Sequence, residues 1–138
     1  MSQDLTLQVQ ETFIAKCKEA ISKLNDTTQK LALVTFPKTG TTRSGPQYCG
    51  KTVAIQSLLR NLVNDTKLNF SVFGYTNRLT RQYAPPGVEY GTYNGVIPES
   101  IQTEYVIVIL AGFETDEKLI RLFSEFSVKK CLFIGFDK

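Results

Sequence analysis

The residues best suited to chemistry lie in one segment, Lys38–Thr52, which reads KTGTTRSGPQYCGKT. Its second half contains Gly45 and Gly50, and Lys51 and Thr52 follow the second glycine directly. Glycines at this spacing allow successive backbone N–H groups to turn inward and form a nest for an anion. An amphipathic helix that begins after Gly50 would add the partial positive charge of its N-terminus. The segment therefore predicts a site for a phosphate group.

Residues 45–52 fit the pattern G-x-x-x-x-G-K-[ST] and resemble the Walker A loop of P-loop nucleotide-binding proteins. The resemblance implies that Lys51 reaches the terminal phosphates of a nucleotide and that Thr52 coordinates its Mg²⁺ ion. A nucleotide with Mg²⁺ is therefore the expected cofactor. The predicted binding residues, from this loop and the basic segment before it, are Gly45, Gly50, Lys51, Thr52, Lys38 and Arg43.

The first half of the same segment, Phe36-Pro-Lys-Thr-Gly-Thr-Thr42, resembles the phosphosulfate-binding loop of sulfotransferases. The resemblance implies that Lys38, Thr41 and Thr42 grip a nucleotide phosphate. The catalytic histidine of those enzymes has no counterpart, because the chain contains no histidine. We therefore expect no sulfonation. Both halves of the segment predict the same chemistry, which is the binding of an anion.

Nucleotide binding is better supported than hydrolysis, because no acidic residue stands where a Mg²⁺ ligand for turnover is expected. The strongest predicted strand, YVIVIL over residues 105–110, continues into Ala-Gly-Phe before the first carboxylate, Glu114. Without a well-placed carboxylate for the metal, efficient hydrolysis is not expected. The sequence therefore identifies no catalytic residue.

The absence of histidine restricts the chemistry further. Without an imidazole, neither Ser-His-Asp nor Cys-His catalysis is available, and no metal can be held by histidine. The three cysteines, Cys17, Cys49 and Cys131, lack the spacing of a zinc site, and we expect neither zinc nor haem. Cys17 and Cys131 are predicted core residues. Cys49 is either a small loop side chain or a reactive thiol beside the predicted helix N-terminus.

Positive charge is concentrated in the middle of the chain. The formal net charge is +3, but residues 37–81 alone carry +6, against 0 for residues 1–36 and −3 for residues 82–138. This asymmetry predicts an anion-binding face, unless folding mixes the charges. The alternative function is a non-enzymatic module that uses this basic face to bind nucleic acid or protein, for example as a subunit of a larger assembly.

A second stretch, residues 75–93, interleaves four tyrosines with Arg78 and Arg81. Aromatic rings can stack on bases and arginine can bind phosphates, as in proteins that hold single-stranded nucleic acid. The same tyrosines could instead pack over the edge of a sheet with their hydroxyls in water. If a nucleotide binds at Gly45–Thr52, this stretch is a natural lid or base-contacting loop.

The hydrophobic pattern alternates between helices and strands. Apolar residues recur at helical spacing over residues 4–24 and again after Gly50, with Ile55, Leu58, Leu59 and Leu62 on one face. Short apolar runs predict strands over residues 31–36, 68–73, 105–110 and 131–134. Residues 74–100 are predicted to be loops with one short strand near 88–96, and Thr115 is predicted to cap a helix that reaches residue 126.

Strands that are apolar on both faces and alternate with helices indicate an α/β fold with a mostly parallel sheet. We expect residues 1–138 to form a single three-layer domain with about four to five strands and about three helices. No apolar run approaches membrane-spanning length, no secretion signal is visible, and the odd cysteine count favours a reducing compartment. The sequence thus predicts a soluble cytoplasmic protein that binds a phosphate-bearing small molecule or nucleotide and no membrane.

Overall fold

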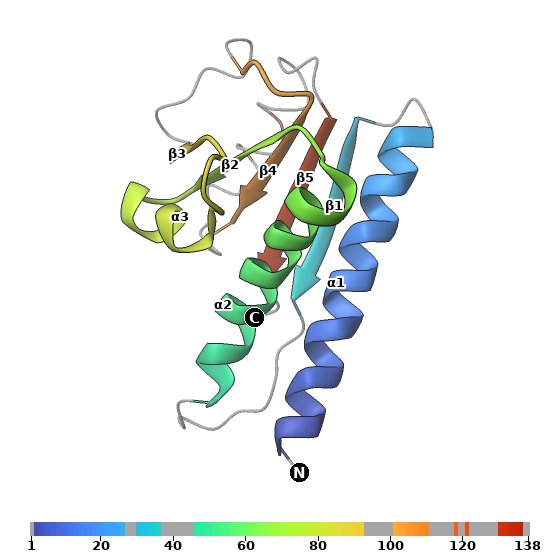
Figure 1. Ribbon diagram of the computed structural model, residues 1–138, viewed down its shortest axis with the longest axis vertical. Coiled ribbons are helices and arrows are strands. Elements are labelled where there is room, and N and C mark those ends of the chain that lie inside the picture. Colours follow the sequence, from blue (N-terminus) through green and yellow to red (C-terminus); the bar gives the residue numbers. More distant parts are fainter. Residues whose placement is uncertain are drawn as a thin grey trace.

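A computed structural model of the chain describes residues 2–26, 30–36, 46–92, 101–110 and 130–136, together with Lys118 and Arg121. Five parallel strands form one sheet in the order β1-β5-β4-β2-β3 (Figure 1). The elements follow one another as α1 (Ser2–Asp26), β1 (Leu31–Phe36), α2 (Pro46–Asn61), the π-helical turn η1 (Leu62–Thr66), β2 (Phe70–Gly74), α3 (Asn77–Tyr83), β3 (Tyr90–Thr92), β4 (Tyr105–Ile109) and β5 (Lys130–Phe136). The predicted α/β fold with a parallel sheet is confirmed.

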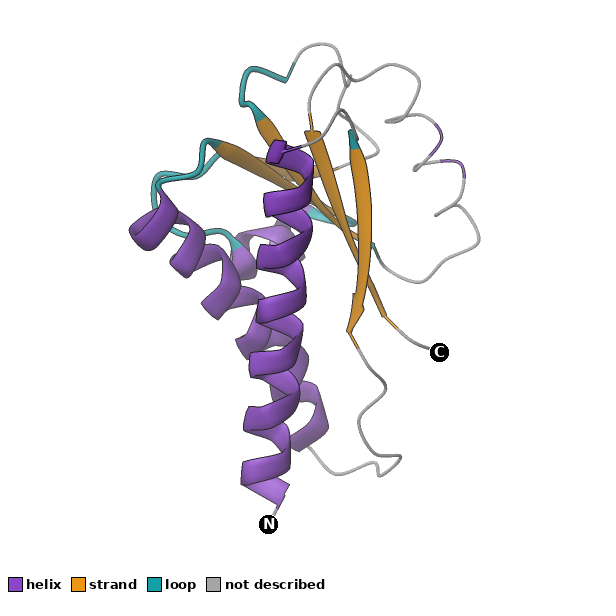
Figure 2. Cartoon of the chain, turned by 90° about the vertical axis from the view of Figure 1, so that its right-hand side faces the viewer, coloured by secondary structure: helices purple, strands orange, loops and turns teal. Residues whose placement is uncertain are grey.

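The two long helices, α1 and α2, lie side by side on one face of the sheet (Figures 1 and 2). Their apolar stripes explain this packing, because Leu24 of α1 and Leu58 of α2 are fully buried in one cluster with Ile107 of β4. The rings of Phe13 and Phe36 lie 5.0 Å apart between centroids. This contact fixes α1 against the carboxyl end of β1.

The opposite face of the sheet is buried as well. Val106 and Val108 of β4 and Phe133 of β5 are fully buried in a second apolar cluster. A strand that is covered on both faces needs apolar residues at every position, which is why β4 reads as an unbroken apolar run in the sequence. The central strands β4 and β5 therefore lie in the core, with apolar side chains packed against both of their faces.

The predicted elements agree with the structure except at short or irregular segments. β1 has the predicted bounds and α1 covers the predicted residues 4–24, whereas β2 begins at Phe70 instead of Leu68. Residues 77–83 were predicted to be loop but form α3, and β3 lies inside the region predicted to hold a short strand. Of the helix predicted over residues 115–126, the structure describes only Lys118 and Arg121, which are helical and exposed. Across the described ranges, no helix has the length and apolar character to cross a bilayer.

Candidate functional site

The two segments that the sequence marks as chemically interesting leave the sheet at the same edge. Residues 38–52 follow the carboxyl end of β1, and residues 75–93 follow the carboxyl end of β2. All strands run parallel, so these two ends lie on one side of the sheet, which we call the carboxyl edge. In open α/β sheets, ligands bind outside the carboxyl ends of the strands. The fold therefore brings both segments to the side where a ligand is most often held.

Helix α2 begins at Pro46 and not after Gly50 as predicted. Proline suits the first position of a helix, because its ring fixes a helical φ and its missing N–H would have no partner there. In such a helix, the amides of Gly50 and Lys51 donate to carbonyls four residues earlier. The predicted nest of N–H groups from Gly45 to Lys51 would therefore need amides that this helix uses internally, and the nest stays a prediction.

The predicted binding residues divide into two groups. Gly50, Lys51 and Thr52 lie in the first two turns of α2. The others, namely Lys38, Arg43 and Gly45 together with Thr41 and Thr42, lie outside the described residues.

The turn from β2 into α3 is held by two threonines. The Thr76 hydroxyl accepts a hydrogen bond from the Leu79 amide (3.1 Å) and caps the helix, and the Thr80 hydroxyl donates to the Thr76 carbonyl (2.7 Å). Gly74 ends β2 so close to this turn that a methyl group on its Cα would overlap the Thr80 hydroxyl. The backbone can therefore reverse directly into α3, which carries Arg78.

Basic side chains on α2 and α3 face solvent. Arg60, Arg78 and Arg81 are exposed, and within the described part of the chain none of them forms an ion pair. The two helices are joined by the Gln56 side chain, whose Nε2 donates to the Gln82 carbonyl (2.7 Å). Arg60 lies one turn after Gln56 and therefore on the same side of α2. These three arginines form what we call the arginine surface.

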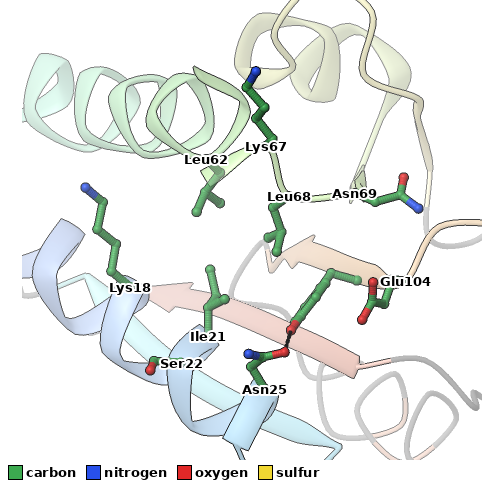
Figure 3. Close-up of a pocket in the computed structure, with 10 residues that line it drawn as sticks. Lys18, Ile21, Ser22, Asn25, Leu62, Lys67, Leu68, Asn69 and Glu104 are labelled. Carbon is green, nitrogen blue, oxygen red and sulfur yellow. Dashed lines mark hydrogen bonds between the residues drawn. The ribbon is translucent and has the colours of Figure 1, made fainter. Parts of the chain in front are cut away.

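A cavity that no sequence pattern indicated lies at the opposite edge of the sheet, where β2 and β4 begin (Figure 3). Its volume is about 440 Å³, and its walls come from α1, from the segment between α2 and β2, and from the start of β4. We call it the amino-edge cavity. The Tyr105 hydroxyl donates to Asn25 Oδ1 (3.0 Å) at its wall. Burial, with the Glu104 and Asp26 carboxylates, raises the pKa of Tyr105, so this hydroxyl keeps its proton.

The two cysteines predicted to be core residues are confirmed as such. Cys17 and Cys131 are buried free thiols. Burial raises the pKa of Cys17 from 9.0 to about 12, so the reactive thiolate is absent at neutral pH. Cys49 lies in the first turn of α2, and its reactivity stays a prediction.

Comparisons of the chain with models of protein families, with curated proteins and with solved structures found no significant match. Function must therefore be inferred from the fold and from the residues that it brings together.

Proposed function

We propose that the protein binds a phosphate-bearing ligand, a nucleotide with its Mg²⁺ ion, at the carboxyl edge of the sheet. The supporting observation is that residues 38–52 join the end of β1 to α2, at the edge where ligands of parallel sheets bind. Lys51 supplies positive charge to the terminal phosphates, and Thr52 supplies a hydroxyl to Mg²⁺. Buried free thiols at Cys17 and Cys131 fit a cytoplasmic protein.

The start of α2 at Pro46 gives this proposal a conformational step. Amides of Gly50 and Lys51 become available to a phosphate only if the first turn of the helix unwinds. Glycine inside a helix is less favourable than alanine by about 1 kcal/mol, so Gly50 makes this unwinding easier. We infer that ligand binding converts the first turn of α2 into the loop that the sequence pattern describes. A Gly50→Ala variant should therefore fold normally and bind nucleotide more weakly.

The proposal is tested by thermal unfolding with and without Mg-ATP and Mg-GTP, on wild type and on Lys51→Ala. A ligand at about one hundred times its Kd adds about 2.7 kcal/mol, which raises the Tm of a small domain by several degrees. We expect this rise in the wild type, its loss in Lys51→Ala, and its retention in Lys16→Ala, which removes an exposed lysine from α1. An equal rise in wild type and Lys51→Ala, or none with either nucleotide, contradicts the proposal.

A second candidate function is the binding of single-stranded nucleic acid by the arginine surface. It is favoured by three exposed arginines on two joined helices, which form no ion pair with any residue that the structure describes, and by the exposed Tyr90 ring nearby in the sequence. Binding of a labelled oligonucleotide should weaken with salt, and an Arg78→Ala/Arg81→Ala variant should lower the log–log slope by about 1.4, about 0.7 for each phosphate contact. Binding that ignores salt, or that needs Lys51 and Mg²⁺, contradicts this candidate.

A role as an assembly subunit is supported by the edge of the sheet at β1. Among the described strands, β1 pairs with β5 alone, and Leu33 on it is 51% exposed. An open edge strand with apolar side chains can pair with another chain. We expect concentration-dependent association in sedimentation experiments, and we expect Leu33→Lys to abolish it. A wild type that stays monomeric at high concentration excludes self-assembly through β1.

A further inference from the structure

We propose that the amino-edge cavity is a second ligand site, which takes a small apolar molecule that carries one anionic group. The site is independent of the proposed nucleotide site, since it lies at the other edge of the sheet. Its volume of about 440 Å³ falls within the range of small-molecule pockets. Its walls come from three segments that are distant in sequence.

The body of the cavity is apolar. Ile21 of α1, Leu62 of η1 and Leu68 before β2 point toward one another across it (Figure 3). Ile21 and Leu62 are both buried, so they are held by the core and present a fixed surface. Such a surface is suited to an aromatic or aliphatic group, which would be removed from water there.

Two of the three charged side chains in the cavity lining are lysines. Lys18 and Lys67 are both exposed, and in Figure 3 their ammonium groups lie at the rim and point away from the apolar walls. Neither lysine forms an ion pair with any described residue. The Tyr105 hydroxyl donates to Asn25 Oδ1, and the Asn25 amide nitrogen can act only as a donor. A rim with more positive than negative charge favours a ligand that carries negative charge.

Negative charge is confined to one side of the cavity. Glu104 is the acidic residue of the lining, and it lies across the cavity from Lys18 (Figure 3). The Lys130 ammonium lies 5.9 Å from the centroid of the Tyr105 ring. The anionic group of the ligand is therefore expected near Lys18 and away from Glu104.

Lys67, one of the two lysines of the lining, ends the helical turn in a left-handed backbone conformation. Its φ of 52° and ψ of 40° lie in the left-handed region, and its N–H donates to the carbonyl of Leu62, the first residue of η1. Glycine or asparagine is the usual residue at such a helix end, because other side chains are strained there. A lysine at this position adds a positive charge to the cavity lining, and its backbone adopts a conformation that is strained for a residue other than glycine.

The probe for the test is 8-anilinonaphthalene-1-sulfonate, which joins apolar rings to one anionic group and fluoresces when it is removed from water. Its neutral counterpart is N-phenyl-1-naphthylamine, which has the same rings without the sulfonate. We expect the folded wild type to bind the sulfonate in a saturable manner and about tenfold more tightly than the neutral compound, a ratio typical of one charge-assisted contact. Mg-ATP should not displace it.

Three variants separate this site from unspecific dye binding. Ser22→Trp, on the exposed part of α1 that lines the cavity, should abolish binding of both compounds. Lys18→Ala/Lys67→Ala should weaken the sulfonate about tenfold and leave the neutral compound unchanged. Lys16→Ala removes an exposed lysine from α1 outside this cavity and should change neither. Unchanged sulfonate binding in Ser22→Trp, or equal affinity of the wild type for both compounds, overturns the proposal.

Discussion

The carboxyl and amino edges of the sheet offer a ligand different physical properties. At the carboxyl edge, solvent-exposed arginines of α3 follow β2, and the predicted phosphate segment follows β1. At the amino edge, a cavity with buried apolar walls carries two lysines in its lining. The first arrangement attracts an anion mainly through charge and is sensitive to salt, whereas the second acts mainly through the removal of apolar groups from water. The two ligands that we propose would therefore be held at opposite edges of one sheet by different forces.

Helix α1 is the element that connects the two edges. Phe13 packs on Phe36 at the end of β1, and Asn25, near the other end of the helix, accepts the hydrogen bond of Tyr105. Substitutions at these two contacts should therefore lower the free energy of unfolding by different amounts, because one removes a buried ring and the other a single hydrogen bond.

The largest effect is expected from Phe36→Ala. Phe36 is 1% exposed, and truncation of such a buried ring costs about 3–5 kcal/mol. The free energy of unfolding in urea should fall by this amount, and both edges should lose their ligands because α1 is no longer fixed. Leu33→Ala, on the same strand but at a side chain 51% exposed, is the control and should cost less than about 1 kcal/mol. Equal costs for the two variants would show that the core lies elsewhere.

An intermediate effect, confined to the carboxyl edge, is expected from Gly74→Ala. The new methyl group would overlap the Thr80 hydroxyl and displace the start of α3, which should cost about 1–3 kcal/mol. Gly91→Ala is the matched control, since its new methyl would meet the Phe73 ring at an ordinary 3.5 Å. Thermal unfolding of both variants measures the difference. If Gly91→Ala is the more damaging, the described approach of α3 to β2 is wrong.

A smaller effect, at the amino edge, is expected from Tyr105→Phe. The loss of the hydrogen bond to Asn25 should cost about 0.5–1.5 kcal/mol in urea unfolding at pH 7. The raised pKa of Tyr105 means that the folded state retains this proton longer than the unfolded state, so wild-type stability should fall as the pH rises above 10.0. The fall should be shallower in Tyr105→Phe. If stability depends on pH identically in the two proteins above pH 10.0, the Tyr105 hydroxyl is not buried as described.

The smallest effect is a gain in stability from Lys67→Gly. Glycine adopts the left-handed conformation without strain, so the free energy of unfolding should rise by about 0.5–1 kcal/mol. The same variant should bind the sulfonate probe more weakly, because it lacks the ammonium group. Lys67→Ala keeps the backbone strain and should also bind the probe more weakly, with no gain in stability. A Lys67→Gly protein less stable than Lys67→Ala would argue against strain at this position.

Much of the fold could be predicted because burial leaves a clear pattern in the sequence. β4 is apolar at every position, and the buried face of α2 repeats at helical spacing through Ile55 and Leu58. α3 was missed because a helix of seven residues has too few turns to show a stripe, although Thr76 is a typical N-cap. The glycine pattern predicts a start of α2 after Gly50, which is wrong by four residues or more, because Pro46 is the stronger helix-start signal.

The two candidate sites differ in how far the sequence could reveal them. The carboxyl-edge site is contained largely in one segment, so its prediction rests on residue types and spacing alone. The amino-edge cavity combines Lys18, Lys67 and Tyr105, which come together only when α1 packs against β4 and the turn before β2. No local pattern contains this information. The left-handed backbone of Lys67 is likewise set by the π-helical turn before it and not by its own residue type.

The most direct test of the account maps both ligands on one sample by nuclear magnetic resonance. Uniformly ¹⁵N-labelled protein would be titrated with Mg-ATP and, separately, with 8-anilinonaphthalene-1-sulfonate, while the backbone amide signals are followed. We predict that Mg-ATP shifts the amides of residues 45–52 and leaves those of Asn25, Leu68 and Tyr105 unchanged, and that the sulfonate does the reverse. A titration in which Mg-ATP leaves residues 45–52 unchanged, or shifts only the cavity residues, would contradict the proposed nucleotide site.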